Sequence, residues 1–260
     1  MLSHLAKLLN KSNRPPCLRT AIIVLLGLSA PFASDIPAYT SSDIFELVSR
    51  PHVGVTLFSI GYGNEKYGST QGGFQLEQSV NGLFGLVGRA AAYQIFKGTI
   101  GYDSPLLPSS RSATRNFGRF QGGVDITPFQ GTSLVLLGGE DVGDSHAPVV
   151  EGDFSSWFAI HTIHPLNVSF TGSHYYQNGV TSGRYDLRTM AVSTADFILL
   201  LGGGGAIWGG GSLTTVKAHG GPEVGIFVRR WHLSVDVQAG YGSAHTYGVV
   251  SVARQFNWDE

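Results

Sequence analysis

The residue types best suited to chemistry occur at every second position of several short segments. Arg184, Asp186 and Arg188 alternate with uncharged residues within 183–192. Side chains two residues apart point to the same face of a β-strand, so these three charges share a face where they can form ion pairs or attract a charged solute. The same spacing elsewhere adds four candidates for this chemistry, which are Arg119, Asp125, Glu223 and Asp236.

Residues 172–180, GSHYYQNGV, contain residue types that a hydrolase uses. A serine nucleophile requires a histidine within hydrogen-bonding reach as its base. Ser173 and His174 are neighbours in the sequence, and neighbours on a strand point to opposite faces. We therefore predict no catalytic residue here and interpret the segment as a polar and aromatic rim.

The sequence predicts no metal or cofactor. The histidines at 161, 164, 219 and 245 lack carboxylate or cysteine partners at the spacing of a metal site, and Cys17 is the single cysteine of the chain. The run LGGGGAIWGGG at 201–211 lacks the lysine and hydroxyl residue of a phosphate-binding loop. We expect the acidic segment 141–153 to be a solvated loop, with a divalent-cation site as the alternative.

Residues 1–34 have the features of a secretory signal peptide. A basic start without acidic residues precedes the apolar run AIIVLLGLSAPFA at 21–33, and small residues follow. The run is too short to span a bilayer as a helix, which takes about 20 residues, and a membrane anchor is the alternative. Residues 35–50 form either a lead-in or a short amphipathic helix.

The composition favours a surface embedded in a membrane. Hydrophobic residues make up 42% of the 260 residues and charged residues 13%, against roughly 25% charged in an average soluble protein. The 17 basic residues fall to 13 if Lys7, Lys11, Arg14 and Arg19 leave with the signal, against 18 acidic residues. This acidic balance gives no support for nucleic-acid binding.

From residue 51 onward the pattern predicts a ladder of strands. Apolar and polar residues alternate in about twelve segments, with ten as the alternative count. The connections between these segments alternate along the chain between short turns and mostly longer segments. The mostly longer connections are 63–70, 97–115, 143–152, 179–182, 207–220 and 244–245. This pattern is typical of a closed antiparallel transmembrane β-barrel over residues 51–260, with short periplasmic turns and longer outer loops.

The polar faces distinguish a membrane barrel from a soluble β-protein. They carry mainly Arg, Asp, Gln, Ser, His and Gly, whereas the polar face of a soluble sandwich is usually rich in Lys and Glu. This composition fits a hydrated lumen of paired groups, with the apolar faces turned to lipid. The pattern assigns no face to residues 195–206, which are apolar on both sides, or to Arg254, which falls on the apolar side of its segment.

The chain resembles a Gram-negative outer-membrane β-barrel protein. The resemblance rests on the signal peptide, the strand ladder over 51–258 and the closing segment YGVVSVARQFNW, in which Phe256 and Trp258 stand at alternate positions. The chain departs from this class by continuing to Asp259 and Glu260. The resemblance implies an outer-membrane location, contact with outer-membrane lipid and lipopolysaccharide, and recognition by the barrel assembly machinery. It identifies no family, and fold alone gives no function.

Two kinds of function fit such a barrel. The first is a narrow channel or an accessory barrel for envelope transport or export, for example of exopolysaccharide, because twelve strands leave a smaller bore than the 16–18 strands of porins. The second is a lipid-acting hydrolase or a purely structural barrel. Residues 172–180 resemble the His-x-Ser-Asn patch of outer-membrane phospholipases and lipid A deacylases, but Tyr176 stands where that pattern has its serine, which disfavours an enzyme.

The charge ladder leaves two hypotheses for the lumen. Arg184 and Arg188 surround a single aspartate, so other strands must supply further carboxylates. Strand order places Asp125 and Asp236 too far away for direct pairing unless the lumen is narrow, whereas Glu223 could reach across it. The arginines therefore either pair across the lumen or form a cationic constriction that favours anionic solutes.

Overall fold

The computed structural model describes residues 53–64, 68–96, 115–129, 131–143, 146–158, 165–176, 179–210, 216–242 and 245–257. The expected signal peptide at 1–34 and the lead-in at 35–50 lie outside these residues. Within the described part of the chain, no helix is long and apolar enough to cross a membrane.

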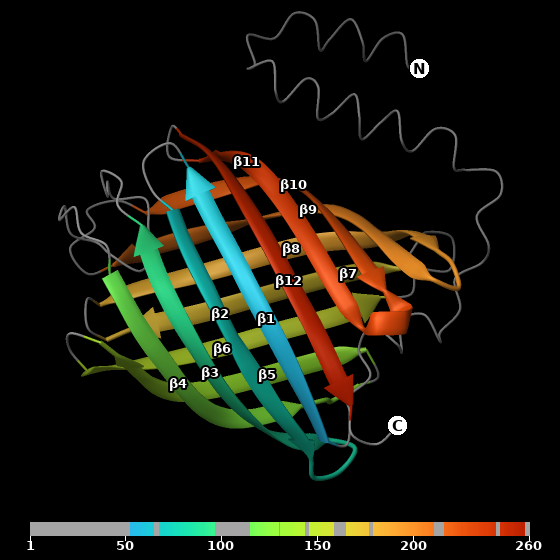
Figure 1. Ribbon diagram of the computed structural model, residues 1–260, viewed down its shortest axis with the longest axis horizontal. Helices are drawn as coiled ribbons and strands as arrows, with labels where there is room; N and C mark the ends of the chain where they lie inside the picture. The colour runs from blue at the N-terminus through green and yellow to red at the C-terminus, as the bar shows by residue number, and fades with distance from the viewer. Residues whose placement is uncertain are drawn as a thin grey trace, which may run out of the picture. The chain divides into compact units, whose positions relative to one another are not determined.

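Twelve antiparallel strands close into a single barrel, which confirms the expected fold and shows that the alternative count of ten is wrong (Figure 1). Each strand pairs with its neighbours in the sequence, and β1 pairs with β12 to complete the ring. The strands are β1 (Val53–Asn64), β2 (Gly68–Ser79), β3 (Phe84–Phe96), β4 (Arg115–Ile126), β5 (Thr132–Val142), β6 (His146–Phe158), β7 (Leu166–Tyr175), β8 (Val180–Ser193), β9 (Phe197–Gly210), β10 (Lys217–Val228), β11 (Leu233–Gly242) and β12 (His245–Asn257).

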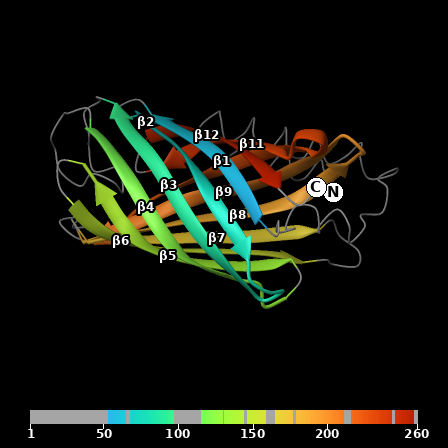
Figure 2. The ribbon, with the colours of Figure 1, turned by 60° about the horizontal axis from the view of Figure 1, so that its bottom comes forward.

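The closing pair β1–β12 is as long as the other pairs of the ring. Its register runs from Gly54 opposite Asn257 to Asn64 opposite Tyr247. Figures 1 and 2 show the wall of β1–β4 in front of that of β7–β9, with the strands of the two walls crossing obliquely. No strand edge is left open within the barrel, which satisfies the backbone hydrogen bonds that a lipid environment cannot satisfy.

Several connections are shorter than the sequence suggested. Strands extend into the expected loops 63–70, 143–152 and 207–220, and 97–114 is the one long connection between the strands of the barrel. The expected bounds of these loops were too wide because they rested on polar and glycine residues. In a barrel such residues also occur within strands, where they face the lumen.

The turns between strands are held by side-chain and backbone hydrogen bonds. Between β2 and β3, the Oδ1 atom of Asn81 accepts hydrogen bonds of 2.8 Å from the backbone N–H groups of Leu83 and Phe84. Between β10 and β11, a short 3₁₀ turn, η1 (Arg229–Trp231), reverses the chain. Arg229 lies in this turn, where its Nε donates to the carbonyl of Thr194 at 2.8 Å.

The two faces of the wall have opposite chemistry. Large apolar side chains such as Leu57, Phe120 and Leu187 are exposed on the outside, where a bilayer would cover them. The inner face carries buried polar and charged groups, among them Arg119 and Glu223. We conclude that the apolar faces of the strands form the outside of the barrel rather than a core.

The structure also assigns the two segments that the pattern left open. In β9, Ile198 and Leu200 point inward and pack against Met190, while the alternate residues face outward. Arg254 lies on the outer face, with its guanidinium 4.6 Å from the centre of the Phe256 ring. Arg254 pairs in register with Leu233, the first residue of β11. It therefore lies at the end of the barrel where β10 turns into β11, called here the turn end, rather than at mid-depth.

The lipid-facing assignment predicts a depth-dependent cost of charge on β11. Val237 lies at mid-strand between Val224 and Val250, and Val235 lies two residues nearer the turn. Val237→Arg should lower the free energy of unfolding by about 2–4 kcal/mol, and Val235→Arg by less, because the penalty falls toward the interface. Reversible urea unfolding in lipid vesicles measures both. Equal tolerance of the two arginines would contradict the assignment.

Candidate functional site in the lumen

The seven side chains singled out from the sequence all lie on the inner face of the barrel. Arg119 belongs to a first ion-pair network, five others belong to a second one, and Asp125 accepts a 3.0 Å hydrogen bond from Ser133. The seven are Arg119, Asp125, Arg184, Asp186, Arg188, Glu223 and Asp236. Their role in lining a path for solutes stays a prediction.

The first network consists of Arg89, Arg119, Asp141, Glu151 and Asp153 on strands β3–β6. The guanidinium of Arg89 pairs with Glu151 and, at 2.9 Å, with Asp153. Arg119 donates two parallel hydrogen bonds to Asp141, from Nε at 2.6 Å and from Nη2 at 2.9 Å, and its Nη1 lies 3.7 Å from Glu151. The bidentate geometry fixes the orientation of the guanidinium plane.

Aromatic rings hold Arg119 from both sides. Its guanidinium carbon lies 4.9 Å from the centre of the Tyr93 ring and 5.0 Å from that of Tyr175. Ser173 on β7 donates a 3.1 Å hydrogen bond to Glu151, the acid that Arg119 shares with Arg89. With only 2% of its surface exposed, Arg119 depends on these partners for the solvation that water would otherwise provide.

The second network consists of Arg184, Asp186, Arg188, Glu223 and Asp236 on strands β8, β10 and β11. Nη1 of Arg188 lies 3.0 Å from Asp236 and 3.6 Å from Glu223, and Nε of Arg184 lies 3.3 Å from Asp186. The charge ladder of β8 is therefore paired with carboxylates. These pairs run along one side of the wall, between β8, β10 and β11, rather than across the lumen.

Glycines explain how Arg188 reaches Asp236 across two intervening strands. The inward position beside Arg188 on β9 is Gly202, and the one beside Asp236 on β10 is Gly225. A Cβ on Gly225 would lie 2.4 Å from Oδ1 of Asp236, so any side chain there would displace the carboxylate. Asp236 was expected to lie too far from the arginines unless the lumen is narrow, and it is within reach of Arg188 because a glycine stands beside each of the two residues on the intervening strands.

Four charged residues of the first network were missed in the sequence. Asp141, Glu151 and Asp153 fell in the segment 141–153 that was expected to be a loop, whereas they lie in β5 and β6 and face inward. Arg89 lies in a strand whose other inward residues are small or apolar, so the alternation around it was weak. Within the described part of the chain, no three His, Cys, Asp or Glu side chains are placed to hold a metal ion.

An aromatic cluster occupies one end of the lumen, the end where β3 ends and β4 begins, called here the loop end. The ring of His219 lies 4.1 Å from that of Tyr247 and 5.2 Å from that of Trp208, measured between ring centres. Tyr62 on β1 stacks on Tyr247 at 6.1 Å. Trp208 and Tyr247 are almost fully buried, so the cluster packs against the inner wall along β9, β10, β12 and β1 and narrows the lumen there.

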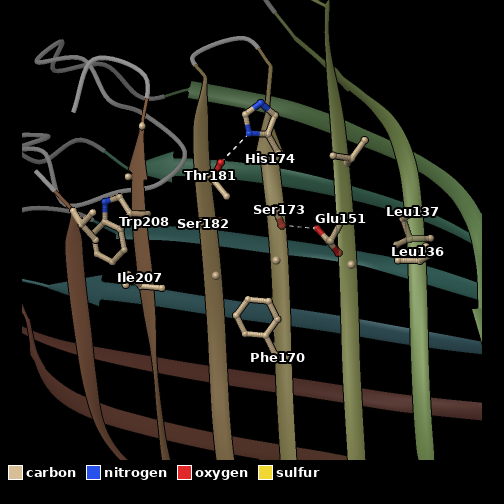
Figure 3. A pocket seen from close by; sticks show the side chains of 17 residues that line it. Leu136, Leu137, Glu151, Phe170, Ser173, His174, Thr181, Ser182, Ile207 and Trp208 are labelled. Atoms are coloured by element: carbon tan, nitrogen blue, oxygen red, sulfur yellow. Dashed lines mark hydrogen bonds between the residues drawn. The ribbon is translucent and has the colours of Figure 1, made fainter. Parts of the chain in front are cut away.

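Ser173 and His174 point to opposite sides of the wall. Ser173 faces the lumen and bonds Glu151, whereas His174 faces outward and its Nδ1 lies 2.9 Å from Oγ1 of Thr181 (Figure 3). The outward ring also packs edge-on against Tyr176, with 4.7 Å between ring centres. Asn178, the asparagine of the segment 172–180, lies outside the described residues. The histidine therefore cannot act as a base for this serine.

The chain matches no known protein family, and no curated protein matches it. Among solved structures, the COG4313 outer membrane channel from Pseudomonas putida F1 is similar, with a TM-score of 0.52 and 7% identity over 80% of this chain and 96% of that chain. A KdgM porin has a TM-score of 0.48 and 12% identity over 78% of this chain and 99% of that chain. LpxR from Salmonella typhimurium has a TM-score of 0.46 and 8% identity over 78% of this chain and 100% of that chain.

The closed ring of twelve strands, its apolar exterior and the likeness to the COG4313 channel define the class of fold. The chain is an outer-membrane-type β-barrel. At these identities the likeness extends to the fold and not to the activity. The function must therefore be argued from the lumen.

The buried pairing of Arg119 predicts a large effect of removing its carboxylate. Asp141→Asn keeps the shape but leaves a guanidinium that is 3% exposed without its main counter-charge, at a cost of about 3 kcal/mol in the free energy of unfolding. The control is Glu140→Gln. Glu140 is the neighbouring, outward and exposed acid that pairs with His146, and its substitution should cost less than about 0.5 kcal/mol. Urea unfolding in lipid vesicles compares them, and equal effects would contradict the described network.

Proposed function

We propose that this protein is a narrow channel of the outer membrane that passes small solutes and favours cations over anions. The observation that carries the proposal is the excess of acids on the inner face. Among the inward side chains that the structure describes, eight are carboxylates and four are guanidinium groups, a formal excess of four negative charges. The acids are Glu77, Asp125, Asp141, Glu151, Asp153, Asp186, Glu223 and Asp236, and the bases are Arg89, Arg119, Arg184 and Arg188.

Partial exposure of the charged groups supports a hydrated lumen. The side chains of Arg184, Asp153 and Arg188 retain 32%, 25% and 21% of their accessible surface although they point into the barrel. Water in contact with these groups stabilises charges that a dry interior would not tolerate unless every one were paired. A purely structural barrel with a packed interior would bury them as completely as Arg119.

The two networks lie on different sides of the ring. In strand order, β3–β6 of the first network and β8, β10 and β11 of the second stand on roughly opposite sides, and all the ion pairs described above join residues of the same network. The space between the networks is therefore bordered by charged groups. A twelve-strand bore narrowed by the aromatic cluster would pass small solutes rather than large ones.

Location and orientation belong to the same proposal. The apolar exterior and the signal-like residues 1–34 support transport of the chain to the outer membrane, with barrel assembly machinery and lipopolysaccharide as its partners there. With twelve strands, both ends of the barrel lie on the same side. We propose that this side is the periplasm and that the connection between β3 and β4 lies outside the cell. An accessory barrel for export would use the same lumen. A lipid-acting hydrolase is disfavoured, because Ser173 and His174 face opposite sides.

Ion selectivity in a planar bilayer tests the proposal. In a salt gradient across the membrane, the reversal potential of the wild type should show preference for the cation. Asp153→Asn with Asp236→Asn should move the permeability ratio toward one. Each substitution leaves the paired arginine a second carboxylate, Glu151 or Glu223, so the barrel should still fold.

Glu140→Gln is the matched control, because it removes one acid from the outer face and should leave the selectivity unchanged. Arg188→Gln should increase the preference for cations by removing an inward positive charge. Absence of conductance, or a wild type that prefers anions, would contradict the proposed function.

A further inference from the structure

A groove of about 860 Å³ lies on the outside of the barrel over strands β5–β9 (Figure 3). Its volume falls within the roughly 300–1,000 Å³ of small-molecule sites. The side chains that open onto it are apolar and exposed, namely Leu136, Val150, Phe170, Ile207 and Val216. Residues on the lumen side of the same strands, such as Ser173 and Glu151, contribute to the wall behind it.

The floor of the groove is bare backbone. Gly152, Gly172 and Gly183 stand side by side in register on β6, β7 and β8, and Leu136 and Ile207 close the row at its two ends. The row spans four strand spacings, about 19 Å. Because strands tilt in a membrane barrel, a row across them runs obliquely through the bilayer.

Residues of different polarity line the two long sides of the groove. Toward the turn end stand Phe154, Phe170 and Tyr185, paired with one another across β6, β7 and β8. The ring of Phe170 covers part of the floor, at 3.1 Å from the position of a Cβ on Gly172 and 3.0 Å from one on Gly183. Both glycines therefore provide space that a side chain would fill.

Toward the loop end the border becomes polar. His174 and Thr181 face each other across β7 and β8 and share a 2.9 Å hydrogen bond through Nδ1 of the histidine. They lie one residue from the ends of these strands, at the level where a barrel meets the membrane interface. Among the described residues the pair has no charged partner, and the second ring nitrogen of His174 has no hydrogen bond to any of them.

We propose that this groove binds one acyl chain of lipopolysaccharide, with an ester, amide or hydroxyl group at the head of the chain hydrogen-bonded to His174. The groove is lined by apolar residues at the depth of the hydrocarbon core and by polar residues at the depth of the interface. A lipid has the same profile, with an apolar chain and a polar group at its head. The row of glycines keeps the floor low, so that the chain can lie against the floor and against the Phe170 ring that covers part of it. The proposal rests on the proposed outer-membrane location and orientation, and not on conductance.

Native mass spectrometry of the full barrel, purified from outer membranes in mild detergent, tests this inference. The wild type should retain one lipopolysaccharide molecule through detergent exchange. Gly172→Val and Gly183→Val should lose it, because the added side chains and the displaced Phe170 ring fill the groove. His174→Ala should weaken retention roughly threefold to tenfold, as expected for one lost hydrogen bond.

Gly88→Val is the matched control, because Gly88 also faces outward, on β3, and a Cβ there would meet nothing within 4 Å. It should retain lipid like the wild type, and circular dichroism should show the same strand content for all variants. The inference is overturned if the groove variants retain lipopolysaccharide as the wild type does, or if the wild type retains only phospholipid or none. A wild-type dimer that Gly183→Val dissociates would likewise overturn it, since a second copy would then occupy the groove.

Discussion

The backbone hydrogen bonding of the closed ring is the constraint on which the rest of the structure depends. In a bilayer no water is available to unpaired N–H and C=O groups, so a sheet must close on itself. Here β1 pairs with β12 along nearly its whole length. Closure divides every strand between two environments at every second residue. One face must suit lipid, and the other must suit a confined interior only a few side chains wide.

The confined interior explains why the charged residues are paired and why glycines accompany them. An isolated charge in a narrow lumen loses much of its hydration, so arginines gather carboxylates from several strands. Gly202 and Gly225 favour one such contact by leaving the inward positions beside Arg188 and Asp236 without side chains. The same residues hold the barrel together and set its interior charge. A change that weakens the second network therefore affects both stability and the interior charge.

Much of the fold follows from local patterns in the sequence, whereas the site depends on contacts between distant segments. The alternation in β4 and β8 was strong enough to place Arg119 and the ladder of Arg184, Asp186 and Arg188 on inner faces. Glu151 was misplaced in a loop because a polar residue beside glycines has the same composition in a loop and in a lumen-facing strand. The pairing of Arg188 with Asp236, 48 residues later, depends on strand register and on the side chains missing between them. No local pattern contains that information.

The central claim is that the lumen is hydrated and acidic, and cysteine reactivity tests it most directly. Ser251 faces inward and donates a 3.3 Å hydrogen bond to Asp236, while the next residue, Val252, faces outward. In a Cys17→Ser background, the Ser251→Cys variant should react with water-soluble thiol reagents, and faster with a cationic reagent than with an anionic one of similar size. The Val252→Cys variant in lipid vesicles should react with neither. A Ser251→Cys variant that stays unreactive, or that reacts faster with the anionic reagent, would contradict the account.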